Sequence, residues 1–126
     1  MKNFTLPILT CALALVLMLV LGCSRASAPP TPLTAEELPA ALEKAFAKAK
    51  PEVKELAAQV VASVQAKSYA KAFQSLQNLA ARPGLTKDQL SVASRATLTV
   101  NELLQAAQTQ GDAKAAQTLK TYRLDK

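Results

Sequence analysis

The 126-residue sequence contains no histidine and no tryptophan, and it holds only three glycines and two cysteines. Without histidine the chain lacks the side chain that most often acts as a general base near neutral pH. Three glycines supply no glycine-rich loop for phosphate, and the nine scattered carboxylates show no spacing typical of metal ligands. A serine–lysine arrangement is the one catalytic alternative left open. We therefore expect no enzymatic activity, no cofactor and no metal site.

Aromatic residues are also scarce, at 4% of the chain. Strands favour aromatic and β-branched residues, whereas the alanine and leucine that dominate here favour helices. The formal net charge is +6, but the basic residues are dispersed and not gathered into one block. Because there is neither a stacking platform nor a recognition motif, this charge does not indicate nucleic-acid binding. It favours solubility and proximity to anionic envelope polymers or lipid headgroups. The composition predicts an all-α protein with no evident small-molecule substrate.

Most of the hydrophobicity lies at the N-terminus. Residues 1–22 begin with "MK", continue with the apolar run "LPILTCALALVLMLVL", and end in Gly22 directly before Cys23. These are the three regions of a secretory signal peptide. The apolar run is close to the length that spans a bilayer, so an uncleaved signal anchor is one alternative and an exported chain with an unmodified cysteine is another. Pro7 and the terminal Gly-Cys pair favour cleavage.

The four residues "VLGC" at positions 20–23 resemble the lipobox of bacterial lipoproteins. The resemblance implies cleavage between Gly22 and Cys23, a diacylglycerol on the Cys23 thiol, and an acyl chain such as palmitate on its amino group. Acyl chains contribute about 0.8 kcal/mol per buried methylene, so two or three of them anchor a protein stably. The implied location is the bacterial cell envelope. Because Ser24 and not aspartate follows the cysteine, the resemblance implies anchoring in the outer membrane, facing the periplasm, if the host has an outer membrane.

The resemblance divides the chain into three parts: a signal peptide at 1–22, a lipidated cysteine with a flexible proline-rich tether at 23–33, and an α-helical domain at 34–126. The tether "SRASAPPTPL" has three prolines and no apolar period, as expected of a semi-extended linker. Cys11 would leave with the signal peptide. The mature chain would then hold one cysteine and no internal disulfide.

The helical domain is marked by repeated start signals. Thr34 with Glu37, and Thr86 with Gln89, have the spacing of capping boxes, and each pair is flanked by leucines at the positions of a hydrophobic staple. Pro39 predicts a kink or restart in a first helix that runs to about Ala49. Apolar stripes predict about five antiparallel helices. The residues expected to face inward on the last four are Val53, Leu56, Ala57, Val60, Val61, Val64, Tyr69, Ala72, Phe73, Leu76, Ala80, Ala96, Val100, Leu103, Leu104, Ala107, Ala116, Leu119 and Tyr122.

A short internal repeat suggests that the domain contains two similar helical hairpins. The segment "AKAFQSL" at 70–76 returns as "AKAAQTL" at 113–119, which is 43 residues later (113 against 70). The spacing of Tyr69, Ala72 and Leu76 resembles the second helix of a tetratricopeptide repeat, which implies stacked hairpins with a protein-binding groove. Tyr69 and Phe73 are then candidate partner-binding residues, unless they belong to the core. Alanine-rich antiparallel helices that converge on the same spacing are the alternative.

The C-terminal sequence "TYRLDK" resembles the end of Braun's lipoprotein family, whose terminal lysine is joined to the cell wall. The resemblance implies wall attachment through Lys126. Two functional hypotheses follow from the whole sequence. The first is a membrane-anchored helical module that binds an envelope protein, whose identity the sequence does not name. The alternative is a structural envelope tether that contacts peptidoglycan.

Overall fold

The computed structural model describes residues 29–125, and every regular element in this range is a helix. The expected signal peptide, Gly22, Cys23, most of the tether and Lys126 lie outside the described residues. The five helices are α2 (Glu37–Phe46), α3 (Pro51–Gln65), α4 (Tyr69–Ala80), α5 (Lys87–Thr109) and α6 (Ala113–Leu124). The prediction of an all-helical domain of about five helices is thus confirmed.

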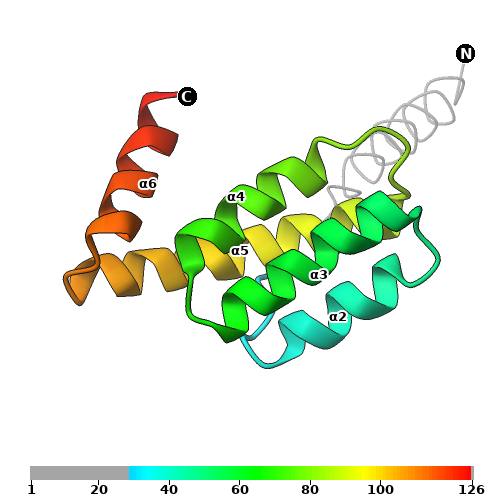
Figure 1. The fold of residues 1–126 in the computed structure, drawn as a ribbon, viewed down its shortest axis with the longest axis horizontal. Helices are drawn as coiled ribbons and strands as arrows, with labels where there is room; N and C mark the ends of the chain where they lie inside the picture. Colours follow the sequence, from blue (N-terminus) through cyan, green and yellow to red (C-terminus); the bar gives the residue numbers. More distant parts are fainter. Residues whose placement is uncertain (1–28, 126) are drawn as a thin grey trace, which may run out of the picture.

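Four of the helices form a closed ring. Helix α2 packs against α3 and α5, and α4 packs against the same two helices from the other side (Figure 1). The core fills the space inside this ring. Its largest fully buried side chains are Phe46, Leu38, Leu42, Leu76, Leu79, Leu104, Val60 and Val100. Helix α6 packs mainly on α5 and to a smaller extent on α4, so it stands outside the ring.

The start of α2 is set by the predicted capping box. The Thr34 amide donates to Glu37 Oε2 and the Glu37 amide donates to Thr34 Oγ1, both at 3.1 Å. The regular helix begins only at Glu37, so Pro39 falls in the first turn, where its missing N–H costs little. The prediction was a kink or a restart near Pro39; the regular helix does begin close to this proline, after a turn at residues 35–36. The helix ends at Phe46, three residues before the predicted Ala49.

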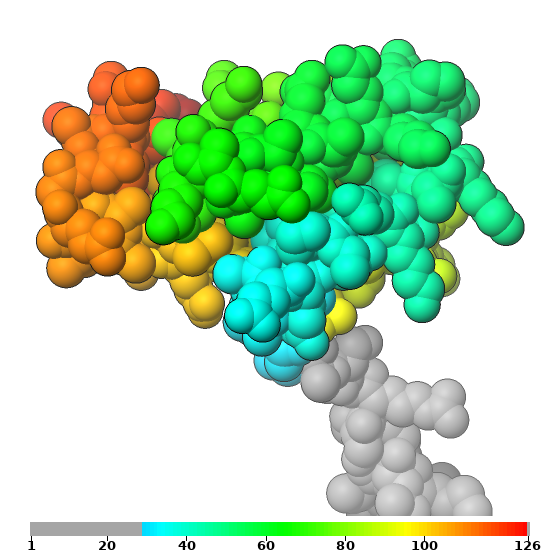
Figure 2. Space-filling view, turned by 60° about the horizontal axis from the view of Figure 1, so that its bottom comes forward, coloured from blue at the N-terminus to red at the C-terminus, as the bar shows by residue number. Residues whose placement is uncertain are grey.

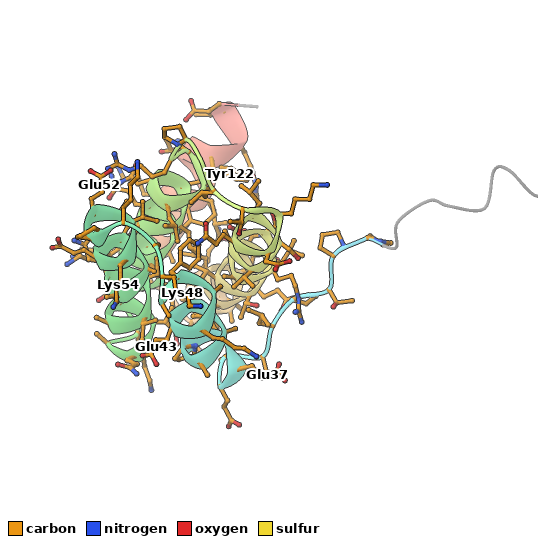
Figure 3. All side chains as sticks on the ribbon, turned by 90° about the vertical axis from the view of Figure 1, so that its right-hand side faces the viewer. Glu37, Glu43, Lys48, Glu52, Lys54 and Tyr122 are labelled. Carbon is orange, nitrogen blue, oxygen red and sulfur yellow. The ribbon has the colours of Figure 1, made fainter. Side chains whose placement is uncertain are left out.

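The chain that leads into α2 is fixed to α5. Leu33 is only 6% exposed, and its carbonyl accepts a hydrogen bond from the Thr99 hydroxyl. Two residues earlier, the Thr31 carbonyl accepts a hydrogen bond of 2.9 Å from Arg95 Nε. In Figure 3 the incoming chain reaches the bundle beside Glu37, at the start of α2. The last residues of the proline-rich segment are therefore part of the folded domain.

The second capping box joins two helices. Gln89 Oε1 accepts from the Thr86 amide at 3.0 Å while the Gln89 amide donates to Thr86 Oγ1 at 3.1 Å. Gln89 Nε2 also donates to the Ala45 carbonyl at 3.2 Å, which ties the start of α5 to the end of α2. The accompanying staple is weaker than expected because Leu90 is 44% exposed. Polar bonds therefore fix this corner more than apolar contact does.

The buried faces follow the predicted stripes with two shifts. On α4 the stripe continues from Leu76 to the fully buried Leu79, and Ala80, which was expected to face inward, is exposed. On α6 the buried alanine is Ala115, and Ala116 is only half-buried. In both helices the apolar face lies one residue earlier than the predicted one, which is within the tolerance of a 3.6-residue period.

Candidate functional site

The turn between α3 and α4 is a Schellman motif, a common way to end a helix. The Ser68 amide donates to the Ser63 carbonyl at 2.8 Å, and the Lys67 amide donates to the Val64 carbonyl at 3.0 Å. Lys67 adopts a left-handed backbone conformation with φ of 56°. A non-glycine residue in that conformation carries a steric cost, so this turn is held against some strain.

The turn between α5 and α6 uses the same motif. The Asp112 amide donates to the Ala107 carbonyl and the Gly111 amide donates to the Gln108 carbonyl, both at 3.0 Å. Here glycine takes the left-handed position, with φ of 93°. The two turns lie 44 residues apart (68 and 112), whereas the sequence repeat in the helices has an interval of 43 residues.

Burial in the helices follows the interval of 43 and not that of the turns. Ala72 and Leu76 on α4 are buried, and so are their counterparts Ala115 and Leu119 on α6. Ala72 lies four residues after Ser68, whereas Ala115 lies only three residues after Asp112. Relative to the preceding turn, the apolar face of α6 is therefore rotated around the helix axis by one residue, about 100°, from that of α4. In Figure 1, α4 lies along the ring while α6 turns away from it at one end. The two hairpins share a turn and a pattern but not an overall geometry.

A groove of about 770 Å³ lies between α4 and α6 and is open to solvent. Helix α4 and helix α6 contribute almost equally to it. Its lining residues are Ala70, Lys71, Phe73, Gln74, Gln77, Lys114, Gln117, Thr118, Thr121, Tyr122 and Asp125. We call this feature the α4–α6 groove.

An aromatic pair closes the floor of the α4–α6 groove. The rings of Phe73 and Tyr122 meet edge to face, with centroids 5.0 Å apart and planes at 81°. Phe73 is only 5% exposed, whereas Tyr122 is half-buried. Of the two aromatic residues singled out from the sequence, Phe73 thus lies at the groove. Tyr69 packs partly buried against the core and is not among the lining residues.

The polar residues of the groove were not identified from the sequence, although a signal for them existed. The repeat "AKAFQSL"/"AKAAQTL" matches not only apolar positions but also Lys71 with Lys114 and Gln74 with Gln117. All four side chains line the groove. The repeated polar positions, which are not needed for the core, therefore indicated a shared surface.

A second, smaller groove of about 440 Å³ lies between α2 and α3. Apolar side chains such as Leu42, Phe46 and Val61 form its floor, and Glu43 and Lys54 stand at its rim. Figure 3 labels both charged residues on the side of the molecule formed by α2 and α3, which lie side by side in Figure 2. This surface carries one acidic and one basic side chain, whereas the α4–α6 groove is lined by two lysines and one aspartate.

The capping box at the start of α2 affects the ionisation of Glu37. The hydrogen bond from the Thr34 amide, helped by the Thr34 side chain and by attraction to Arg95, holds the pKa of Glu37 below its ordinary value. Elsewhere in residues 29–125, no group of three or more His, Cys, Asp or Glu side chains could hold a metal ion. Nor does this part of the chain contain a helix long and apolar enough to cross a membrane.

Comparison with known proteins finds no match: no protein family, no curated protein and no solved structure is similar enough to this chain to be counted. The class that the coordinates define is a small helical bundle, a four-helix ring with one additional helix.

Proposed function

We propose that this chain is a lipid-anchored protein of a bacterial envelope that binds another protein through its helical bundle. The anchor is inferred from the lipobox-like sequence that ends in Cys23. The binding role is inferred from the α4–α6 groove, which is the observation that carries the proposal. An exposed groove on a small domain with an aromatic floor has the features of a protein-docking surface.

The composition of the groove favours a macromolecular partner over a small molecule. Small-molecule sites enclose most of their ligand and fix it with a few converging polar groups. The α4–α6 groove is open along one side, and its polar groups are long flexible side chains such as Lys71 and Gln117. Such a surface suits a chain segment that lies across it.

The anchor is tested by intact mass spectrometry of the protein purified from membranes. The expected mass is that of a chain that begins at Cys23 and carries two or three acyl chains. A Cys23→Ser variant should keep its N-terminus and lose all acyl mass. Retention of Met1 in the unmodified protein would refute cleavage and, with it, the lipid anchor.

The binding role is tested by photo-crosslinking in intact cells. A photoreactive residue placed at Gln117, in the groove, should give a discrete crosslinked protein band, while the same residue at Gln59, exposed on α3, should not. Equal crosslinking at both positions would argue against the groove. Two other results would favour the peptidoglycan tether instead. The protein would be released only after muramidase digestion of the cell wall, and a Lys126→Ala variant would be found in the soluble fraction without that digestion.

A further inference from the structure

The two helices that form the α4–α6 groove carry basic residues and no acidic ones. Helices α4 and α6 contain no aspartate or glutamate, although the chain holds nine such residues. The same two helices carry four basic residues: Lys71, Lys114, Lys120 and Arg123. Helices α2, α3 and α5 each carry at least one carboxylate as well as basic residues. The nearest acidic residues to these two helices in sequence are Asp112 and Asp125, which cap the two ends of α6.

Two of these basic residues lie within the groove. Lys71 and Lys114 come from the first turns of α4 and α6, and they are equivalent positions of the internal repeat. Within residues 29–125 neither ammonium group has a carboxylate at ion-pair distance. The nearby Asp112 is engaged elsewhere, because its Oδ1 accepts from the amides of Lys114 and Ala115 at 2.9 and 3.1 Å. Among the described residues, one carboxylate lines the groove, that of Asp125, and it lies at the opposite end of α6.

The remaining lining groups suit a peptide backbone. Gln74, Gln77 and Gln117 are exposed along the two walls, and each side-chain amide can both donate and accept a hydrogen bond. An extended chain presents alternating N–H and C=O groups that need such partners. Between the walls, the half-buried ring of Tyr122 over Phe73 offers an apolar contact.

We propose that the α4–α6 groove binds an acidic, extended peptide segment of the partner protein. Carboxylates of the segment pair with Lys71 and Lys114, the glutamines bind its backbone, and an apolar side chain packs on the Tyr122 ring. Along α6 the lining runs from Lys114 to Asp125, about 16 Å at the rise of an α-helix, which corresponds to roughly five residues of extended chain. This inference rests on the proposed protein-binding function and specifies its partner.

An anionic membrane surface is the competing ligand for a basic site. A bilayer is flat on this scale and meets protruding cations, whereas Lys71 and Lys114 line a groove. A bilayer would also make no use of the glutamines or of the aromatic floor. The groove shape therefore favours a peptide.

The test measures the fluorescence anisotropy of a labelled, capped peptide in which glutamate alternates with leucine and serine. The peptide has about six residues, a length chosen to span the groove. The full chain is used, purified in a non-ionic detergent. A Lys71→Glu/Lys114→Glu variant should bind the peptide at least about ten-fold more weakly, because attraction becomes repulsion. The matched control is Lys48→Glu/Lys54→Glu, which makes the same charge change on the α2–α3 side and should bind as the wild type does.

Further peptides and lipids complete the test. The same peptide with glutamine in place of glutamate should bind weakly to the wild-type chain, and added salt should reduce binding of the acidic peptide. Equal affinity for both peptides, or an equal loss in the two charge variants, would overturn the inference. So would displacement of the peptide by phosphatidylglycerol in mixed micelles, which would assign the lysines to lipid. Because this assay needs neither anchoring nor a cellular partner, its failure leaves the crosslinking test of the proposed function unaffected.

Discussion

Phe73 on α4 and Tyr122 on α6 form an edge-to-face pair with ring centroids 5.0 Å apart. The pair links the helix outside the ring to a helix within it. Phe73 belongs to the buried core, while Tyr122 is packed against it from the groove side. The same contact therefore holds α6 in place and forms the floor of the groove.

Truncation of this pair should show the coupling between α6 and the ring. Phe73→Ala leaves a cavity in the core and should lower the free energy of unfolding by about 3–5 kcal/mol. Tyr122→Ala should cost less because Tyr122 is only half-buried. Urea unfolding of both single variants and the double variant should give a coupling energy of about 0.5–1.5 kcal/mol, as found for aromatic pairs. Additive effects would mean that the two rings do not stabilise each other. Phe73→Leu serves as the milder variant if Phe73→Ala does not fold.

The Thr99 hydroxyl should anchor the chain that precedes α2. Thr99→Val removes its hydrogen bond to the Leu33 carbonyl and leaves that buried group without this partner, so stability should fall by about 1–3 kcal/mol. The matched control is Thr97→Val, which removes a bond of 2.8 Å to the Ala93 carbonyl within the same helix. Hydrogen exchange should become faster at the start of α2 in the Thr99 variant only. The same exchange rates in both variants would contradict the proposed anchor.

The two Schellman turns should respond to substitution in opposite directions. Lys67→Gly relieves a left-handed lysine and should stabilise the chain by about 0.5–1 kcal/mol. Gly111→Ala introduces the same kind of strain and should destabilise by about 1 kcal/mol. No atom lies within 4 Å of a Cβ added at Gly111, so the cost there comes from the backbone alone. Thermal unfolding of the two variants checks both signs, and a stabilising Gly111→Ala would refute the assignment.

The capping box at Thr34 should make stability depend on pH. The pKa of Glu37 is lowered in the folded chain, first by the Thr34 amide, so the ionised carboxylate is favoured on folding. This contribution is complete above the ordinary glutamate pKa and is lost as the pH falls through the lowered value. The melting temperature of Glu37→Gln should therefore fall less than that of the wild type between pH 5 and pH 3, a window set by the ordinary carboxyl pKa of about 4.3. Glu36→Gln is the control, since it removes a neighbouring charge and leaves the Thr34–Glu37 bonds in place.

Much of the bundle follows from signals that are local in the sequence. Both capping boxes form as the Thr34–Glu37 and Thr86–Gln89 spacings predict, because each is made by groups three residues apart. The end of α2 was predicted less well. The chain at both ends of α2 is held by residues far away in the sequence: the Leu33 carbonyl accepts a hydrogen bond from Thr99, 66 positions on, and the Ala45 carbonyl accepts one from Gln89, 44 positions on.

The candidate site was harder to predict because it arises from a difference between two similar hairpins. The repeat predicts equivalent helices, and burial at Ala72 and Ala115 agrees with it. The α4–α6 groove, however, is formed where α6 leaves the ring. The turns before α4 and α6 lie 44 residues apart, one more than the repeat in the helices, and this difference is seen from the hydrogen bonds of the Ser68 and Asp112 amides. Tyr69 and Phe73 look alike as sequence positions, yet only Phe73 lies under the groove.

The contact between α2 and α5 closes the ring, so a chain that folds from its N-terminus cannot close the ring until α5 is present. Helices α2, α3 and α4 alone leave the buried face of α2 half covered, because its second neighbour is α5. A fragment that ends within α5 lacks part of the buried face that covers α2 and α4, so the apolar faces of these helices stay partly exposed until α5 is complete. Helix α6 comes last and packs on a ring whose four helices already contact one another, so its arrival covers the outer side of the core with Ala115, Leu119 and Tyr122.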